Sequence, residues 1–384
     1  MNDMRDLFSD EHHQYRDTVR RFFRTEVDPH ARAWEAQGIF PREIFRKAAA
    51  AGLLQPSMPT EYGGGGGDLL HEVIVSEEHG HCLGVAGLEA FLSTDLSSHV
   101  IWRTGTEAQK RYWIPKYASG DVVAEVGITE PQSGSDAAST RTTAVRQGDH
   151  FVLNGTKAWI SNLTHCDMVL VLARTNPAEQ GAKGLSILLV DTASPGFTRS
   201  KPMETAVKGA GNVGTAYFDD VKVPIDRLLG GVEGKGLAQV MTAVNTARLV
   251  QASRWLACCE SAFALTVDYV KERKAFGQRV LDFQNTQFRL ADVKTDIAVG
   301  RGFLDNLLRR ALKGDVSFED SAMAKLWISE METRVMDQCV QLHGGAGVAN
   351  ESPISKLWTS SRVHRIFIGT SEMQRMAIAR SIGT

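Results

Sequence analysis

The spacing of apolar residues divides the chain into three zones. Over about the first 120 residues the spacing is helical, with aromatic or apolar side chains every three to four positions across 12–23. Ser9 is placed to cap this first helix, and Pro41 to open another helix that Gly52 ends. The glycines of 63–67 fit either a flexible loop or a cofactor contact.

From about 122 to 223 the pattern becomes that of strands. Short apolar runs at 151–153, 168–172 and 185–190 are separated by turn residues. Asn154-Gly155, flanked by apolar residues, predicts a hairpin turn. A sheet or barrel is therefore expected in the middle of the chain.

From about 234 onward the pattern returns to long helices. Periodic segments cover 235–269, 285–313 and 317–342, and Gly344-Gly345 interrupts the last.

The order of these zones predicts an α+β fold of three domains. The expected domains are an N-terminal helical domain (1–121), a middle β-barrel or sheet domain (122–231) and a C-terminal four-helix bundle (232–384).

Composition narrows the class of protein. The chain has 384 residues, 43% of them hydrophobic, and a net charge of −2, so nothing favours nucleic-acid or anionic-membrane binding. Five scattered cysteines show no metal-ligand spacing, and no metal site is expected. No apolar stretch is long enough to span a membrane, and the acidic N-terminus is not a targeting peptide. These features predict a cytoplasmic protein.

Five motifs follow one another along the chain. They are TEPQSGSD (129–136), WISN (159–162), RKAFG (273–277) with Gln284, QLHGG (341–345) and GTSEMQ (369–374). Together they resemble the signatures of the acyl-CoA dehydrogenase family, and the resemblance covers nearly the whole chain. It is closest to the long-chain and isovaleryl types. It implies an oxidoreductase that uses FAD to oxidise an acyl thioester, carried on CoA or an acyl carrier protein.

A flavin site needs groups of the kind that these motifs contain. Thr129 and Ser161 offer hydroxyls, Trp159 offers an aromatic face, and Arg273 offers a guanidinium suited to phosphate. The residues that the resemblance assigns to FAD are Val126, Ile128, Thr129, Gly134, Ser135, Trp159, Ile160, Ser161, Arg273, Phe276, Gln284, Gln341, Gly344, Gly345, Thr370 and Glu372.

In the family, the Arg273 and Gly345 segments reach FAD from different subunits. The resemblance therefore implies a homo-oligomer, usually a tetramer formed from two dimers. It also leaves an electron-transferring flavoprotein or oxygen as the electron acceptor.

The resemblance places the thioester between the β-domain and the C-terminal helices. The residues assigned to substrate binding are Ser135, Asn245, Arg248, Gln251, Phe367 and Gly369. A polar Gln251 beside the acyl chain indicates either a substrate with its own polar group or a glutamine turned away from it.

The family's catalytic base is missing from both of its usual positions. Most members carry a glutamate where this chain has Ile368, and a minority carry it where this chain has Ala247. Neither side chain can accept a proton, although the backbone N–H of Ile368 can still polarise a carbonyl.

Several explanations of the missing base remain open. Asp95 is the first substitute to consider and Glu89 a weaker one, while a structural role for Asp95 is the competing interpretation. Alternatively, the chain is a flavin-dependent reductase, an elimination enzyme or a monooxygenase, or a non-catalytic thioester-binding flavoprotein.

Overall fold

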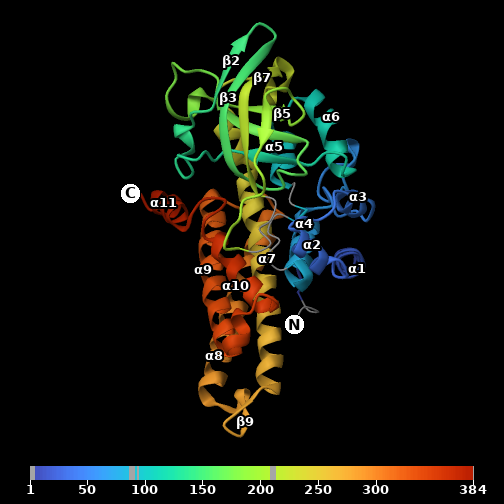
Figure 1. The fold of residues 1–384 in the computed structure, drawn as a ribbon, viewed down its shortest axis with the longest axis vertical. Helices are drawn as coiled ribbons and strands as arrows, with labels where there is room; N and C mark the ends of the chain where they lie inside the picture. Colours follow the sequence, from blue (N-terminus) through green and yellow to red (C-terminus); the bar gives the residue numbers. More distant parts are fainter. Residues whose placement is uncertain (1–4, 86–90, 93–94, 208–212, 384) are drawn as a thin grey trace.

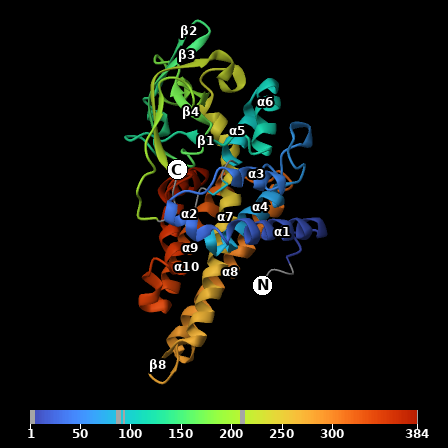
Figure 2. The same ribbon diagram turned by 45° about the vertical axis from the view of Figure 1, so that its right-hand side comes forward.

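The computed structural model describes residues 5–85, 91–92, 95–207 and 213–383, and its fold has three parts. A sheet lies at one end, a long helical bundle extends away from it, and a group of shorter helices lies along one side of the bundle (Figures 1 and 2). The predicted α+β fold, with helical parts before and after a middle sheet, is confirmed. In the described residues, no helix is long and apolar enough to cross a membrane.

The N-terminal part is helical, as its spacing predicts. Its helices are α1 (Asp10–Phe22), α2 (Ala31–Gln37), α3 (Glu43–Ala50), α4 (Leu69–His81), α5 (Asp95–Thr104) and α6 (Glu107–Ala118). Ser9 caps α1 by accepting a hydrogen bond from the His12 N–H, which confirms the predicted start of this helix.

The glycines of 63–67 form a packed loop. The N–H groups of Gly64, Gly65, Gly66 and Gly67 donate to carbonyls within 55–59 at 2.8–3.2 Å. This loop therefore covers the 55–59 segment, which borders the pocket described below.

The middle part is a curled sheet. Its strands are β1 (Ala124–Gly127), β2 (Thr143–Gln147), β3 (His150–Ile160), β4 (Met168–Arg174), β5 (Leu185–Asp191), β6 (Phe197–Arg199) and β7 (Gly214–Pro224). The order is β1-β4-β2-β3-β7-β6, with β5 paired to β4, and β1 runs parallel to β4.

The predicted hairpin turn at Asn154-Gly155 is wrong. Both residues lie inside the continuous strand β3, where the pairing with β7 shifts register between Leu153 and Gly155. Gly155 has φ +144°, and a Cβ there would lie 2.5 Å from Thr142 Oγ1, so the glycine serves a β-bulge. The real turn is Gly148-Asp149, between the paired residues Gln147 and His150.

The C-terminal part is built on three long helices, close to their predicted bounds: α7 (Gly236–Glu272), α8 (Gln284–Ala311) and α9 (Phe318–His343). The short strands β8 (Lys274–Ala275) and β9 (Gln278–Arg279) form a hairpin between α7 and α8, and α10 (Pro353–His364) and α11 (Ser371–Ser381) complete this part. The hairpin lies at the tip of the bundle, remote from the sheet (Figure 1).

Helix α4 packs closely against α7. Ser76 Oγ donates to the Val250 carbonyl at 2.8 Å, and a Cβ at Gly80 would lie 2.6 Å from the Arg254 carbonyl. Only a residue without a side chain allows this approach. The two contacts pair position 76 with 250 and position 80 with 254, so the two helices run side by side in the same direction.

Candidate active site

The segments 129–136 and 159–162 are held side by side by a buried ion pair. Lys157 Nζ lies 2.8 Å from Glu130 Oε1 and donates to the Ile128 carbonyl at 2.9 Å, while the Ala158 N–H donates to the Thr129 carbonyl. Burial opposes ionisation of Glu130, but Lys157 and the N–H groups of Arg141 and Thr142 hold its pKa at about 2. Glu130 is therefore a structural anchor of the two segments.

Trp159 presents an aromatic face beside this anchor. Its side chain is 60% exposed although Ala158 and Ile160 on either side are buried. Its φ of +60° is uncommon for a bulky residue and turns the indole out of the strand. Thr129 and Ser161 are half-buried nearby in sequence, and Gly134 and Ser135 are exposed.

Ile368 lies close to the same end of the sheet. With Val126 and Ile128, it packs against a hydrophobic cluster formed by the sheet, α5 and α7. Its φ of +53° is strained for a β-branched side chain. The 368–369 loop is fixed by Gln374, because its Nε2 donates to the Ile368 and Gly369 carbonyls at 3.2 and 2.8 Å.

The turn that follows begins helix α11. Thr370 is the N-cap of α11 and accepts from the Met373 N–H, while Glu372 is exposed. Val126, Ile128 and Ile368 thus border one hydrophobic cluster, with Thr370 two residues after Ile368 along the chain.

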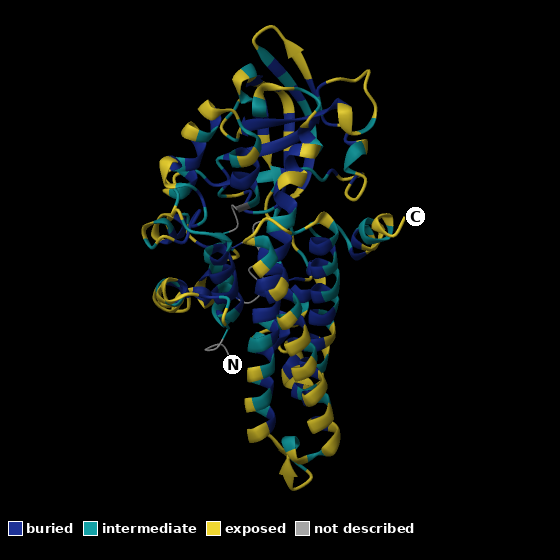
Figure 3. Cartoon of the chain, turned by 180° about the vertical axis from the view of Figure 1, so that it is seen from behind, coloured by how far each residue is buried: buried dark blue, intermediate teal, exposed yellow. Residues whose placement is uncertain are grey.

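The other predicted FAD residues lie far from this region. Arg273, Phe276 and Gln284 are exposed at the tip of the bundle, where Phe276 is 97% exposed. Gln341, Gly344 and Gly345 are also at this end, since the neighbouring His343 stacks on Tyr269 near the end of α7 with ring centroids 4.4 Å apart. Exposed residues gather at the tip (Figure 3). Within one chain, these two groups do not meet Trp159.

Arg248 lies beneath the 368–369 loop. A Cβ at Gly369 would be 3.7 Å from Arg248 Nη2, so the guanidinium adjoins one base position directly and follows the other, Ala247, in sequence. Arg248 is 4% exposed, donates to Ser321 Oγ at 3.2 Å and lies over the Phe318 ring. Burial lowers its pKa to about 10. Asn245 accepts from the same Ser321 hydroxyl at 2.9 Å.

Sequence reasoning missed Lys325 on α9. Its side chain is fully buried, and its Nζ makes no hydrogen bond within the described residues. Burial, together with the nearby Arg248, lowers its pKa to about 8.

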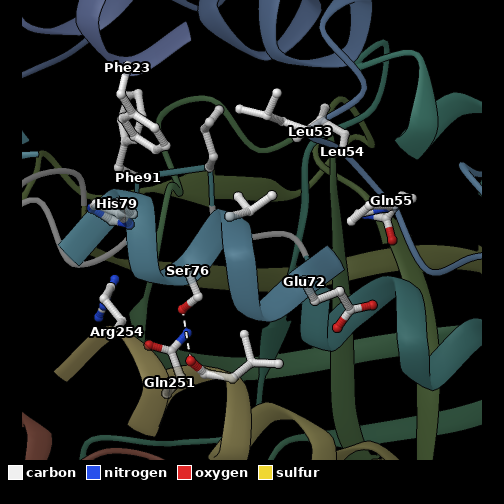
Figure 4. A pocket seen from close by; sticks show the side chains of 14 residues that line it. Phe23, Leu53, Leu54, Gln55, Glu72, Ser76, His79, Phe91, Gln251 and Arg254 are labelled. Atoms are coloured by element: carbon white, nitrogen blue, oxygen red, sulfur yellow. Dashed lines mark hydrogen bonds between the residues drawn. The ribbon is translucent and has the colours of Figure 1, made fainter. Parts of the chain in front are cut away.

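A pocket lies between α4 and α7, and it contains about 660 Å³ of space not filled by atoms, part of it open to solvent. One face of α7 carries Ala247, Val250, Gln251 and Arg254 at helical spacing, and the last three line the pocket. The opposite wall comes from α4, through Glu72, Val75, Ser76 and His79 (Figure 4). Ala247 lies about one turn before these lining residues on the same face of α7.

Gln251 is the polar residue that the sequence places here. It lines the pocket, and its buried Oε1 accepts no hydrogen bond from any described residue. Phe367 lies instead against Trp255, with ring centroids 6.0 Å apart, and Trp255 is fully buried outside the pocket wall. Trp255 therefore does not narrow this pocket.

Among the described residues that line this pocket, Glu72 is the one carboxylate, and sequence reasoning missed it as well. It is 7% exposed; its Oε1 accepts from Ser57 Oγ and lies 2.7 Å from His99 Nε2. Burial opposes its ionisation, but His99, Ser57 and Arg103 hold its pKa below the usual value. The two earlier substitutes are not placed: Glu89 and the Asp95 side chain lie outside the described residues, although Asp95 begins α5.

Comparison with known proteins identifies the fold. Family models for the acyl-CoA dehydrogenase N-terminal, middle and C-terminal domains match residues 9–121, 126–221 and 234–383. The chain belongs to the acyl-CoA dehydrogenase family. The long-chain specific acyl-CoA dehydrogenase of Rattus norvegicus mitochondria is 38% identical over 99% of this chain and 88% of the relative.

Solved structures of the acyl-CoA dehydrogenase family superpose on the whole chain. An acyl-CoA dehydrogenase from Geobacillus kaustophilus matches with a TM-score of 0.93 and 37% identity, covering 99% of this chain and 100% of that one. A glutaryl-CoA dehydrogenase from Mycobacterium smegmatis in complex with FADH2 matches with a TM-score of 0.90 and 28% identity, covering 99% and 96%.

The residues present fit the flavin of an acyl-CoA dehydrogenase. A planar ring system needs an uncovered aromatic or apolar face, which the exposed Trp159 and the half-buried Val126 and Ile128 provide. At the tip, Arg273 and Phe276 are exposed, as expected of a surface that another molecule covers.

Proposed function

We propose that this protein is an FAD-dependent oxidoreductase that acts on an acyl thioester, by default through α,β-dehydrogenation. The observation that carries the proposal is a set of three surfaces. Trp159 offers an exposed aromatic face on the sheet, Ile368 packs against the cluster shared by the sheet and α7, and α7 further along lines a pocket, as a flavin, a thioester and an acyl chain require. FAD, when bound, would accept the hydride from the β-carbon of the acyl chain.

The FAD would lie against Trp159, Ile160 and Ser161, with the hydroxyl of Thr129 at its edge. Val126, Ile128, Gly134, Ser135, Thr370 and Glu372 are the other contacts proposed from the same end of the chain's fold. Arg273, Phe276, Gln284, Gln341, Gly344 and Gly345 lie too far away to contribute within one chain. We infer that they serve the FAD of another copy, in a homotetramer formed as a dimer of dimers.

For the thioester, we propose Ser135, Asn245, Arg248, Gln251, Phe367 and Gly369 as contacts. Arg248 is the strongest of these, because it is a buried cation with no carboxylate partner among the described residues. The Ile368 N–H is proposed to polarise the thioester carbonyl, which would make the α-proton more acidic. The strained φ at this position supports a functional use of its backbone.

The electron acceptor is proposed to be an electron-transferring flavoprotein. We further propose a cytoplasmic location, because the five cysteines form no disulfide.

The test is the absorbance of the purified protein. Bound FAD should give a flavin band that bleaches without oxygen when the right acyl-CoA or acyl-carrier-protein thioester is added. Bleaching by a reduced nicotinamide, followed by return of the flavin band when an enoyl thioester is added, would instead identify a reductase, and oxygenated product would identify a monooxygenase. A flavin band that no thioester bleaches or perturbs would contradict the proposal, whereas perturbation without bleaching would identify a non-catalytic binder.

A further inference from the structure

Neither usual base position can transfer a proton, so this chain needs another group for that step. Ala247 and Ile368 are both apolar, and Arg248 beneath them is a cation that cannot accept one. A proton acceptor must reach the acyl chain next to the thioester. Such a group must be a titratable side chain that lines the pocket close to Ala247.

Glu72 lies at that level of the pocket. Ser76 donates to the Val250 carbonyl and Gly80 lies against the Arg254 carbonyl, so successive turns of α4 face successive turns of α7. One turn earlier on α4, Glu72 therefore faces the preceding turn of α7, which contains Ala247.

Arg103 gives a second measure of the same position. Its Nη2 donates to Thr246 Oγ1 at 2.8 Å, and its charge is among those that lower the pKa of Glu72. Both observations place the Glu72 carboxylate next to the α7 turn that carries the base in other members of the family.

The Glu72 carboxylate is held on one side only. Its Oε1 is occupied by Ser57 and His99, whereas its Oε2 accepts no hydrogen bond in the part of the chain that the structure describes. Because the side chain also lines the pocket, Oε2 is the atom left to meet a ligand. A carboxylate that is ionised, fixed in orientation and open at one oxygen has the properties of a general base.

We propose that Glu72 is the acid–base residue of this protein, in place of the glutamate at the two usual positions. This inference rests on the proposed function, which supplies FAD as the oxidant. The α-C–H bond breaks and its proton passes to Glu72 Oε2, while the electron pair of that bond forms the new C=C bond. The β-hydrogen leaves with its own electron pair to the flavin. In the reverse direction, protonated Glu72 returns the proton to the α-carbon.

The experiment follows proton transfer separately from hydride transfer. The probe is the 3-thia analogue of the acyl-CoA that changes the wild-type flavin spectrum most, by bleaching or by a shift; sulfur replaces its β-carbon, so its α-hydrogens can exchange but no β-hydride can leave. Exchange of the α-hydrogens with D₂O is measured by mass spectrometry. Wild type should exchange them, and Glu72→Gln should do so at least about 100-fold more slowly. Flavin content should be unchanged, and the flavin spectrum should still respond to the probe.

A second variant tests whether the loss is one of proton transfer alone. Glu72→Gln/Ala247→Glu supplies a carboxylate from the opposite wall and should regain at least about tenfold of the lost exchange. The matched control is Glu61→Gln, an exposed glutamate outside the pocket, which should exchange like wild type. Exchange at the wild-type rate in flavin-loaded Glu72→Gln would overturn the proposal, and so would its loss in Asp95→Asn or Lys325→Met alone.

Two further outcomes are distinguishable. If Glu72→Gln does not retain flavin, Glu72→Asp keeps the charge but withdraws it by one methylene, and it should slow exchange about 10- to 100-fold; a wild-type rate there would also overturn the proposal. If wild type holds flavin and exchanges α-hydrogens but no thioester bleaches it, dehydrogenation fails while the role of Glu72 in proton transfer stands.

Discussion

Two of the buried carboxylates on helix α4, Glu72 and Glu77, have different surroundings. Glu77 is fully buried, and Arg5, Arg16 and Arg301 contact both of its oxygens at 2.6–2.7 Å. Glu72, five residues earlier, has partners on one oxygen and a pocket beside it. Both have lowered pKa values, so ionisation alone does not separate them. The two glutamates differ in the partners of their carboxylate oxygens. Arginines contact both oxygens of Glu77, whereas Oε2 of Glu72 is left to meet a ligand.

The largest expected effect concerns Glu77. Glu77→Gln leaves three arginines beside a neutral amide, so it should lower the free energy of unfolding by about 3–5 kcal/mol. Urea denaturation followed by circular dichroism measures this change. α-Hydrogen exchange in the folded fraction should remain at the wild-type rate, and a selective loss of exchange with full stability would reverse the assignment of the two glutamates.

Lowering the pH should also reduce the free energy of unfolding through Glu77. Burial opposes ionisation, but Arg301, Arg5 and Arg16 hold the folded pKa at about 2, below its ordinary value of 4.5. Its stabilisation is therefore complete above pH 4.5 and is lost as the pH falls towards 2, a contribution of about 3 kcal/mol. Between these pH values, wild type should lose more stability than Glu77→Gln. Parallel losses in the two proteins would contradict the assigned pKa.

Removing one partner of Glu72 should have a smaller effect on stability and a visible one on pH dependence. Ser57→Ala deletes a hydrogen bond to Oε1 and should cost about 1 kcal/mol of unfolding free energy. The pKa of Glu72 should rise, because the hydrogen bond to its ionised form is lost. The groups that face Glu72 and remain are His99 and Arg103 on α5, Tyr15 on α1 and Arg254 across the pocket.

The pH profile of α-hydrogen exchange reports this shift. Exchange needs ionised Glu72, so its rate falls as the pH drops through the pKa of that carboxyl. In Ser57→Ala the fall should begin at a higher pH than in wild type. If the exchange rate fell at the same pH in Ser57→Ala as in wild type, the titrating group would not be Glu72.

The smallest expected effect is at the surface. Glu61→Gln removes an exposed pairing with Arg111 at 3.9 Å and should change the free energy of unfolding by less than about 0.5 kcal/mol. Urea denaturation of this variant gives the reference value against which the losses of unfolding free energy predicted above are compared. A larger loss would mean that a glutamate-to-glutamine change is itself costly, and that the Glu77→Gln result does not isolate the arginine cluster.

Local patterns predicted much of the fold. The three long helices follow from apolar spacing, and the cap at Ser9 follows from its position before that spacing begins. The turn at Asn154-Gly155 was wrong because the same residue pair also suits a β-bulge, and only the pairing with β7 decides between them. The Gly148-Asp149 turn was available in the sequence and was missed.

The candidate site was less predictable, because its carboxylate depends on distant partners. Glu72 meets Ser57 from 15 residues before it and His99 from 27 residues after it. No spacing rule connects these positions. The one available indication was a glutamate within the apolar run of α4, a position that fits a buried pair such as Glu77 equally well. The flavin residues were easier to assign, because their motifs are continuous stretches of sequence.

The most direct test of the account is the rate at which a thioester reduces the flavin without oxygen, measured by stopped-flow absorbance in a single turnover. Glu72→Gln should still bind the thioester, as a spectral shift before reduction, but should be reduced at least about 100-fold more slowly than wild type. Adding Ala247→Glu to this variant should recover part of the rate. Reduction of Glu72→Gln at the wild-type rate would contradict the claim that the acid–base residue lies on α4.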